Sequence, residues 1–280
     1  MPELAEVEYY RKRWDPALGQ TVARVILRPA SRLLRGANPK HLSEALTGAV
    51  LESSAAAAKQ MLFRFSGDAW LGIHLGMTGE LKLAAPEYLV GKHDHLVLFT
   101  AQHALVFSDF RQFGRIQFSV GPEAPDWWTS IAPPVLSSEF TPEAVAGFLR
   151  RRQRAPIKAV LLMQERFPGI GNWMADEILW RAEIHPKRPA GSLSPDEIQA
   201  LWREARWVCR EALRTVGQDL RDPPRTWLFP HRWENGGVCP KTGVPLVREE
   251  IGGRTTCWSP GRQKLKPGKK STRASRSRAR

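Results

Sequence analysis

Residues 167–177 read FPGIGNWMADE, and this stretch is the strongest indication of the fold. Gly169 and Gly171 stand directly before a helical segment, and Ile157 to Glu165 has the pattern of a preceding helix. Backbone amides opened by the two glycines, with the helix N-terminus beyond them, would form a phosphate site. A structural turn between two helices would use the same glycines. The stretch therefore predicts a helix-two-turn-helix element whose turn either binds an anion or only joins the helices.

Outward from this element the apolar periodicity changes twice. From Thr141 to about Val216 the pattern is helical, with helix starts at Thr141-Pro142-Glu143 and Ser194-Pro195. Between about residues 20 and 118, short alternating or wholly apolar runs separated by Gly, Pro, Asn and Asp predict a strand-rich sandwich or barrel. Such runs are Val22–Leu27, Met61–Phe65, Trp70–His74, His95–Thr100 and Ala104–Ser108.

The two ends of the chain complete the α+β organisation. Glu3 to about Trp14 has helical spacing and predicts a leading helix. After Asp222-Pro223-Pro224, two short strands joined through Ile251-Gly252-Gly253 predict a hairpin. The expected domains are an N-terminal β-sandwich at 1–132, a helical domain at 133–222, a hairpin finger at 223–263 and a disordered basic tail at 264–280.

The charge balance favours a polyanionic partner. Lys and Arg number 42 against 28 Asp and Glu, which gives a formal charge of +14. The basic tail explains only part of the excess, because Arg150–Arg154 and Lys158 lie well inside the predicted fold.

Three cysteines without a secretory signal suggest a reducing, cytosolic setting. No apolar run approaches the roughly 20 residues that span a bilayer, so a membrane protein is excluded.

The first eight residues, MPELAEVE, predict a nucleophile. Removal of Met1 would leave Pro2 as an N-terminal secondary amine, and an α-amino group has a pKa of about 8. Such an amine can attack a sugar C1′ and form an iminium, and Glu3 and Glu6 within one helical turn could transfer protons. The alternative is an ordinary helix start, where Pro fits the first position and acids favour the positive end of the dipole.

Several separated motifs extend over nearly the full chain. They are Pro2-Glu3-Leu4 with Glu6-Val7-Glu8, Lys59 before an apolar strand, His74-Leu75-Gly76-Met77-Thr78-Gly79, Lys92-His93-Asp94-His95, Asp109 with Arg111, Phe113 and Gly114, Gly169 to Glu177 with His185-Pro186, and Gly253-Arg254-Thr255-Thr256. In this order they resemble the formamidopyrimidine-DNA glycosylase/endonuclease VIII family of base-excision repair. The Gly-Ile-Gly-Asn-Trp form and the Gly-Gly-Arg-Thr-Thr ending resemble the formamidopyrimidine branch, particularly its plant and fungal type.

The resemblance implies four catalytic residues. Pro2 would form the Schiff base at C1′, Glu3 would act as general acid/base on the sugar, Lys59 would assist β-elimination, and Arg254 would hold the phosphate beside the lesion and assist δ-elimination.

The resemblance also implies a DNA interface. Met77, Arg111 and Phe113 would fill the void that a flipped-out lesion leaves. The remaining DNA contacts would come from His93 and Arg111 and from the phosphate-binding residues Asn172, Lys158, Arg152 and Arg154. His74 and His95 are expected to be structural histidines.

Two departures from the family pattern modify these expectations. The four-cysteine zinc finger of many relatives is absent, because Cys239 is followed by Thr242, Ser259 and Arg262 at the other ligand positions. We therefore expect no metal, no cofactor and a zincless finger, held by packing of Leu246, Val247, Ile251 and Trp258 with support from Trp227, Phe229 and Trp233. Gly217 to Asn235 also lacks the long loop that covers 8-oxoguanine in bacterial relatives.

The expected function is a bifunctional DNA glycosylase/AP lyase for oxidised purines, namely formamidopyrimidines and hydantoins, with weak activity on 8-oxoguanine. The alternatives are an endonuclease VIII-like enzyme for oxidised pyrimidines and a non-catalytic damaged-DNA binder. The expected partner is damaged double-stranded DNA, bound by a monomer. The expected location is cytoplasmic at a bacterial nucleoid, or nuclear in a eukaryote.

Overall fold

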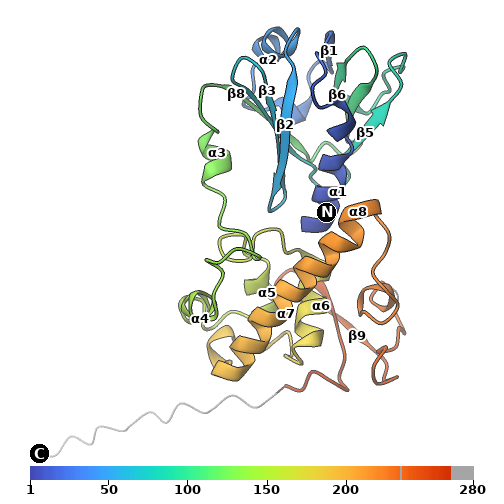
Figure 1. The fold of residues 1–280 in the computed structure, drawn as a ribbon. Helices are drawn as coiled ribbons and strands as arrows, with labels where there is room; N and C mark the ends of the chain where they lie inside the picture. Colours follow the sequence, from blue (N-terminus) through green and yellow to red (C-terminus); the bar gives the residue numbers. More distant parts are fainter. Residues whose placement is uncertain (234, 266–280) are drawn as a thin grey trace, which may run out of the picture.

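The computed structural model describes residues 1–233 and 235–265. A β-sandwich and a mainly helical lobe follow one another, with α1 (Leu4–Lys12) at their junction (Figure 1). The expected α+β class is confirmed. Across the described ranges, no helix is long and apolar enough to cross a membrane. The tail predicted at 264–280 lies outside the described residues from position 266 onward.

Two four-stranded antiparallel sheets form the sandwich. One sheet has the order β1-β6-β7-β5 and the other β2-β3-β4-β8. The strands are β1 (Arg24–Leu27), β2 (Leu51–Ala57), β3 (Gln60–Phe65), β4 (Ala69–His74), β5 (Glu80–Ala84), β6 (Asp94–Phe99), β7 (Ala104–Ser108) and β8 (Arg115–Val120). The five apolar runs named from the sequence all coincide with strands, and their ends agree to within two residues.

Aromatic side chains fill the space between the sheets. Phe63, Phe65 and Phe107 are fully buried there. Trp14 packs with its ring centroid 4.7 Å from that of Phe63, and its Nε1 donates to the carbonyl oxygen of Lys82 at 3.1 Å. A buried indole stabilises a core when its N–H has such a partner.

Two short helices lie on the sandwich. The helix α2 (Pro39–Leu46) packs against β1, and α3 (Asp126–Thr129) lies beside the second sheet (Figure 1). Trp127 of α3 fits over Gly72, where a Cβ atom would stand 2.4 Å from the indole. This contact explains why β4 is buried on both faces.

The helical lobe is built around α6. Its helices are α4 (Pro142–Arg151), α5 (Ile157–Leu161), α6 (Asn172–Arg181), α7 (Pro195–Arg214) and α8 (Val216–Asp219). Eight of the ten α6 residues are buried, because α7 and the C-terminal hairpin pack against this helix. The cap residues Thr141 and Ser194 accept backbone N–H bonds at the expected starts of α4 and α7.

The leading helix α1 belongs to both lobes. Ala5 lies in the core of the helical lobe, whereas Val7 lies in the core of the sandwich. The helix contacts α7 and α8 on one side and β2, β3 and β5 on the other. The sequence predicted a leading helix of the first domain, and the structure makes it the element that joins the two.

The C-terminal finger is the predicted hairpin. It consists of β9 (Val247–Ile251) and β10 (Arg254–Trp258), and the turn glycines Gly252 and Gly253 have φ angles of +61° and +74°. Positive φ at both turn positions is typical of a type I′ turn, which matches the twist of the strands. The buried cluster beneath the finger contains Trp180, Leu228, Cys239, Leu246 and Cys257.

Of the side chains expected to support the finger, Leu246 lies in this cluster, Ile251 is buried, and Trp227 and Phe229 pack in the core of the helical lobe. Trp233 differs from these. It is 52% exposed, with Phe229 and Arg232 against its ring. The prediction was wrong for this residue, because its indole borders a cavity between the two lobes and not a core.

Candidate active site and nucleic-acid interface

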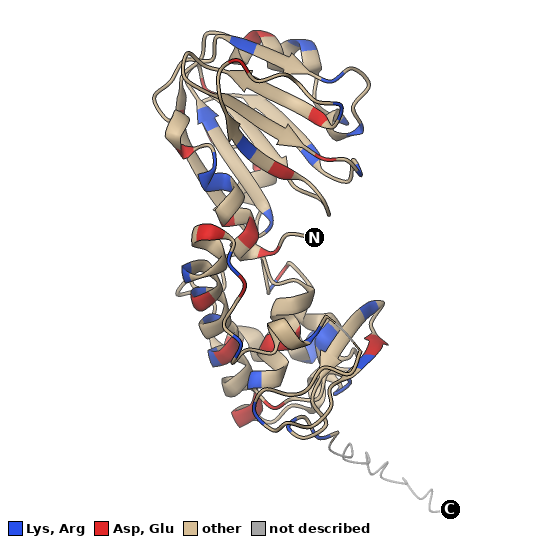
Figure 2. Cartoon of the chain, turned by 90° about the vertical axis from the view of Figure 1, so that its right-hand side faces the viewer, with Lys and Arg blue, Asp and Glu red and all other residues tan. Residues whose placement is uncertain are grey.

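A cavity of about 630 Å³ lies between the two lobes. The end of the chain that carries Pro2 emerges at this opening, between the sandwich and the finger (Figure 2). Segments from both lobes supply the walls. Among the lining residues are Pro2, Glu3, Lys59, Met77, Asn172 and Arg254. All four predicted catalytic residues therefore face one space, together with one predicted void-filling residue and one predicted phosphate ligand.

The Glu3 carboxylate is seated on the first turn of α6. Its oxygens accept backbone N–H bonds from Gly171 at 2.9 Å, Trp173 at 2.9 Å and Met174 at 3.1 Å. The Leu4 N–H donates to the Gly169 carbonyl oxygen at 3.0 Å. A helix N-terminus favours a negative group for this reason. The glycine turn thus holds the protein's own carboxylate.

Glycine is required at position 171 by this close approach. A Cβ atom there would stand 2.3 to 2.5 Å from the Glu3 side chain. The residue has a φ of −123°, so the requirement comes from space and not from backbone conformation.

The protonation of Glu3 is matched to neutral pH. Burial raises the pKa of Glu3 to about 7, and the neighbouring Glu6 carboxylate adds to the rise, against the opposing effect of the amide bonds and Lys59. A carboxyl group that is half protonated near pH 7 is suited to proton transfer.

Lys59 reaches the cavity from a tight hairpin turn. The turn joins β2 to β3, and Ala58 takes a φ of +55° within it. Burial lowers the pKa of Lys59; the Arg254 charge adds to this effect, whereas Glu3 and Glu6 oppose it. A lowered pKa favours the neutral form of the amine, which is the form that can accept a proton.

Asn172 begins α6, and Arg254 begins β10 of the finger, which packs against α6. The Asn172 amide donates to the Thr255 carbonyl oxygen at 2.8 Å, so the first residue of α6 is tied to the finger next to Arg254. The Arg254 side chain is exposed toward the cavity. A guanidinium held at this mouth can bind a phosphate through paired N–H donors.

The structure corrects the role of Lys158. This side chain is 0% exposed, and its ammonium donates to Asp176 Oδ1 at 2.5 Å and to the Asn172 carbonyl oxygen at 2.7 Å. Asp176 Oδ2 also accepts from Arg232 at 2.6 Å and from the Cys257 backbone N–H at 3.0 Å. The prediction of a direct phosphate contact was wrong for Lys158, because packing encloses it in a network that joins α5, α6 and the finger.

The predicted void-filling loops touch each other. Met77 is 42% exposed and Phe113 is 55% exposed, as expected for residues that enter a base stack. Gly76, with a φ of +63°, allows the backbone of Phe113 to approach; a Cβ atom would stand 2.4 Å from it. The Arg111 guanidinium lies 4.8 Å from the Phe113 ring centroid. We call the residues Met77, Arg111 and Phe113 the wedge.

Asp109 organises the wedge, and sequence reasoning gave it no role. Its Oδ1 accepts from the Thr78 hydroxyl at 2.6 Å and from the Arg111 N–H at 3.2 Å, and its Oδ2 accepts from the Gly114 N–H at 2.8 Å. The side chain is buried. Its place in the motif with Arg111 and Gly114 was the only signal. The Asp109 N–H also donates to the carbonyl oxygen of His93, which places that predicted DNA contact beside the wedge.

The other predicted contacts and histidines lie outside the cavity. Arg152 packs on Phe148 and lies 3.6 Å from Glu165, and Arg154 is exposed nearby. Their phosphate roles stay predictions.

Both histidines that were expected to be structural have internal hydrogen bonds. His74 Nδ1 accepts from the Gly76 N–H at 3.0 Å. His95 hydrogen-bonds to Ser31 and to the Asp109 carbonyl oxygen.

The finger residues do not fit a zinc ion. Cys239 is buried in the apolar cluster, where its sulfur accepts from Trp180 Nε1 at 3.4 Å. Within residues 1–233 and 235–265, no group of three His, Cys, Asp or Glu side chains could hold a metal. Tetrahedral zinc needs four such ligands.

Comparisons with known proteins agree with this arrangement. The formamidopyrimidine-DNA glycosylase N-terminal domain model matches residues 1–116, and the formamidopyrimidine-DNA glycosylase H2TH domain model matches residues 131–223. The chain belongs to the formamidopyrimidine-DNA glycosylase family. It is accordingly an enzyme, a DNA glycosylase of DNA repair.

Relatives of known name cover most of the chain. The formamidopyrimidine-DNA glycosylase of Chloroflexus aurantiacus is 37% identical over 79% of this chain and 80% of its own length. That of Carboxydothermus hydrogenoformans is 33% identical over 94% of this chain and 100% of its own length. The plant and fungal subtype stays a prediction.

Solved structures of the glycosylase family share the fold. The Lactococcus lactis enzyme with DNA containing an oxidised pyrimidine has a TM-score of 0.85 and 26% identity, and it covers 94% of this chain and 100% of its own. A mutant of the same enzyme with Fapy-dG-containing DNA has a TM-score of 0.84 at the same identity and coverage.

Proposed function

We propose that this glycosylase is bifunctional, removing oxidised purines from double-stranded DNA and nicking the strand as an AP lyase. The supporting observation is that Pro2, Glu3, Lys59 and Arg254 line one cavity although they come from three distant parts of the chain. The protein acts as a monomer, at the bacterial nucleoid or in a nucleus. Damaged DNA lies across the opening between the two lobes.

The first steps occur at C1′ of the damaged nucleotide. After removal of Met1, the Pro2 nitrogen attacks C1′, the bond from C1′ to the base breaks, and the base leaves. The departing base takes up the proton of the Pro2 nitrogen. The nitrogen lone pair then opens the C1′–O4′ bond of the sugar, and O4′ takes a proton from Glu3. The product is an iminium between C1′ and Pro2. Glu3 suits this step because its pKa is about 7.

The elimination steps use Lys59 as a neutral amine and Arg254 as a cation. Lys59, whose pKa is lowered, accepts the proton from C2′ as the 3′-phosphate leaves. A second proton is lost from C4′ as the 5′-phosphate leaves, and Arg254 binds the negative charge of that phosphate. The strand is left with phosphates on both sides of a one-nucleotide gap.

The wedge stabilises the flipped-out state. Met77 and Phe113 replace the lost stacking, and Arg111 hydrogen-bonds to the unpaired base in the opposite strand. His93, Asn172 and the pair Arg152 and Arg154 hold backbone phosphates, which set the position of the duplex and carry no lesion information.

Formamidopyrimidines and hydantoins are the preferred lesions. Residues 216–233 form the short α8 and a segment held to α6, where Glu177 accepts the N–H groups of Leu228 and Phe229. Leu220, Phe229 and Trp233 form an apolar wall of the cavity instead of a covering loop. Single-turnover rates on matched duplexes test this preference, and equal or faster removal of 8-oxoguanine would contradict it.

The finger works without zinc. Because apolar packing around Cys239 and the Asp176 network supports the hairpin, prolonged chelation is expected to change neither the melting temperature nor the nicking rate. Loss of either on chelation, with recovery on adding zinc, would overturn this part of the proposal.

Borohydride trapping on a duplex with one formamidopyrimidine tests the enzyme itself. Hydride reduces the iminium, so the unmodified protein forms a stable covalent complex with DNA. The Pro2→Gly variant still has an amine at the N-terminus, in this case a primary one. Residues added ahead of Pro2 block the nucleophile, and this change is expected to abolish trapping. Tight binding without trapping or nicking would support the alternative of a non-catalytic damage binder.

The endonuclease VIII-like alternative keeps the same chemistry with oxidised pyrimidines as substrates. One observation favours testing it, because a Lactococcus lactis relative of this fold was solved with DNA containing an oxidised pyrimidine. A panel of lesion duplexes separates the two. Faster release of oxidised pyrimidines than of formamidopyrimidines would favour the alternative.

A further inference from the structure

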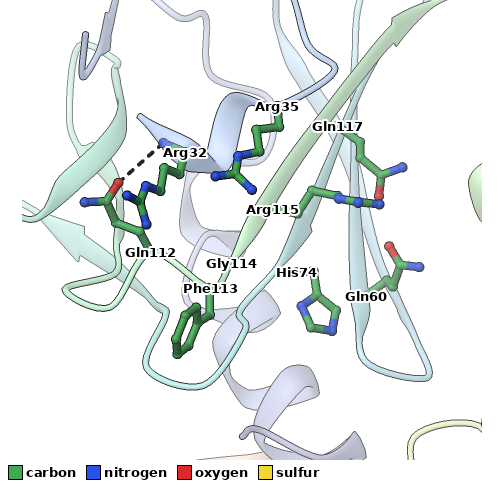
Figure 3. Close-up of a pocket in the computed structure, with 9 residues that line it drawn as sticks. All are labelled: Arg32, Arg35, Gln60, His74, Gln112, Phe113, Gly114, Arg115 and Gln117. Atoms are coloured by element: carbon green, nitrogen blue, oxygen red, sulfur yellow. Dashed lines mark hydrogen bonds between the residues drawn. The ribbon is translucent and has the colours of Figure 1, made fainter. Parts of the chain in front are cut away.

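A second cavity, of about 430 Å³, opens on the sandwich. Arg32 and Arg35 reach it from the segment before α2, and Arg115 reaches it from the start of β8 (Figure 3). We call this the arginine pocket. Gln60, His74 and Gln117 also line it, and none of its lining residues lines the catalytic cavity.

The arginine pocket concentrates unneutralised positive charge. All three arginines are exposed, no acidic side chain lines the pocket, and none of the three has an ion pair within the described part of the chain. By contrast, Arg11 and Arg188 each pair with a carboxylate at 3.1 Å or less. Gathered like charges favour an anionic partner, and the guanidinium fork matches the oxygens of a phosphate.

The arginine pocket adjoins the wedge. Gln112 and Phe113 line it, and Gln112 Oε1 accepts from the Arg32 backbone N–H at 3.4 Å (Figure 3). Gln112 has a φ of +55°, which brings its side chain back toward Arg32. Anything bound to the arginines therefore touches the loop that holds Phe113.

We propose that the arginine pocket binds a backbone phosphate of the duplex, away from the nucleotide in the catalytic cavity, and so positions the wedge loop. The inference rests on the proposed function, because it takes DNA as the ligand. A free small anion would gain nothing from the wedge beside it. A duplex that enters the catalytic cavity on one side of Met77 and Phe113 continues past the arginine pocket on the other side.

Salt dependence of binding tests the pocket directly. The variants Arg35→Gln and Arg115→Gln, and the triple variant that includes Arg32→Gln, are compared with Arg203→Gln. Arg203 is an exposed residue of α7, and its partner is Glu204. Binding is measured on a duplex that carries an uncleavable abasic analogue, which requires no chemistry at Pro2.

Loss of one phosphate contact lowers the slope of log affinity against log salt by about 0.9. We expect this change in the triple variant, with a loss of affinity of about 10-fold at 0.1 M salt and no change in Arg203→Gln. An unchanged slope in the triple variant overturns the proposal. The single variants provide the same comparison if the triple variant fails to fold.

Neutral linkages identify the strand. A single methylphosphonate is moved along the damaged strand and then along the opposite strand. At the position that contacts the pocket, it weakens binding of the unmodified protein but not of the triple variant. If no position on either strand shows this difference, the pocket does not bind a backbone phosphate.

Trapping with borohydride on the same variants separates this proposal from the proposed function. Failure of the unmodified protein to trap, with the salt and linkage effects present, would remove the catalytic proposal and keep the pocket. Normal trapping without the salt and linkage effects would remove the pocket proposal and keep the catalytic proposal.

Discussion

The Glu3 seat, which consists of the backbone N–H groups of Gly171, Trp173 and Met174, differs from the arginine pocket in how it satisfies charge. Glu3 is buried and has three backbone N–H donors, so the protein itself satisfies its carboxylate. The arginine pocket contains three exposed guanidinium groups and no carboxylate. An internally satisfied charge fixes geometry before any ligand arrives, whereas an unsatisfied one lowers its energy only when a partner binds.

The contrast assigns different tasks to the two regions. Preorganised groups act on the reacting atoms because they need no rearrangement during the reaction. Exposed cations act on affinity and register, and salt weakens them. Substitutions at the seat should therefore affect rate, and substitutions at the basic surfaces should affect binding.

The largest expected effect follows from Glu3→Gln. Its amide cannot give up a proton to the sugar, so the single-turnover rate should fall about 10²- to 10⁴-fold. The pKa of Glu3 is raised from 4.5 to about 7, so the acid form dominates below pH 7 and its contribution to the rate is lost as pH rises through 7. The variant should lack this limb of the pH–rate profile. A limb near pH 7 that persists in the variant would belong to another group.

Gly171→Ala should give the next largest loss of rate without removing any catalytic group. Its Cβ atom would displace the Glu3 carboxylate, so the rate should fall at least about 10-fold, because small misplacements of a positioned group are costly. Gly217→Ala in α8 is the control, since its Cβ atom has 3.5 Å to the nearest atom. Equal rates in the two variants, measured at saturating enzyme, would break the link between the seat and catalysis.

Asp109→Asn tests a satisfied charge that serves binding. One of its oxygens becomes an NH2 group facing an N–H or hydroxyl donor, so stability should fall by about 1–3 kcal/mol. With the wedge loops loosened, binding to the lesion duplex should weaken more than binding to single-stranded DNA. Thermal unfolding and binding assays measure the two effects. An equal loss on both DNA forms would assign Asp109 to the fold alone.

The smallest effect is expected from deletion of residues 264–280. This basic segment should raise non-specific affinity by releasing counterions, so its removal should lower the salt slope of binding to undamaged duplex. The single-turnover rate on the lesion duplex should stay the same. An unchanged slope would refute this role for the tail.

Local patterns predicted most of the elements. Cap residues marked the starts of α4 and α7, and paired glycines marked the finger turn, because these signals act through neighbouring backbone groups. The motifs also named Pro2, Glu3, Lys59 and Arg254, which line one cavity. Patterns gave no warning that Ala5 and Val7 of one helix would enter different cores.

Lys158 and Trp233 show why some side-chain roles were mispredicted. Lys158 follows a basic run in the sequence. Only the packing of α5 against α6 buries its ammonium group against the Asp176 carboxylate. Trp233 looks like a core residue, yet it borders a cavity. Burial depends on contacts between distant segments, and the periodicity of one segment does not show which other segments will pack against it.

The sequence by itself determined the leading helix, the glycine turn before α6, the finger hairpin and the identities of Pro2 and Glu3. These features depend on residue type and on neighbours along the chain. Only the tertiary structure decided that the glycine turn holds Glu3, that its pKa is about 7, and that Arg32, Arg35 and Arg115 share one pocket. Electrostatic energy depends on distance and burial in space, and folding sets both by bringing together residues 80 or more positions apart.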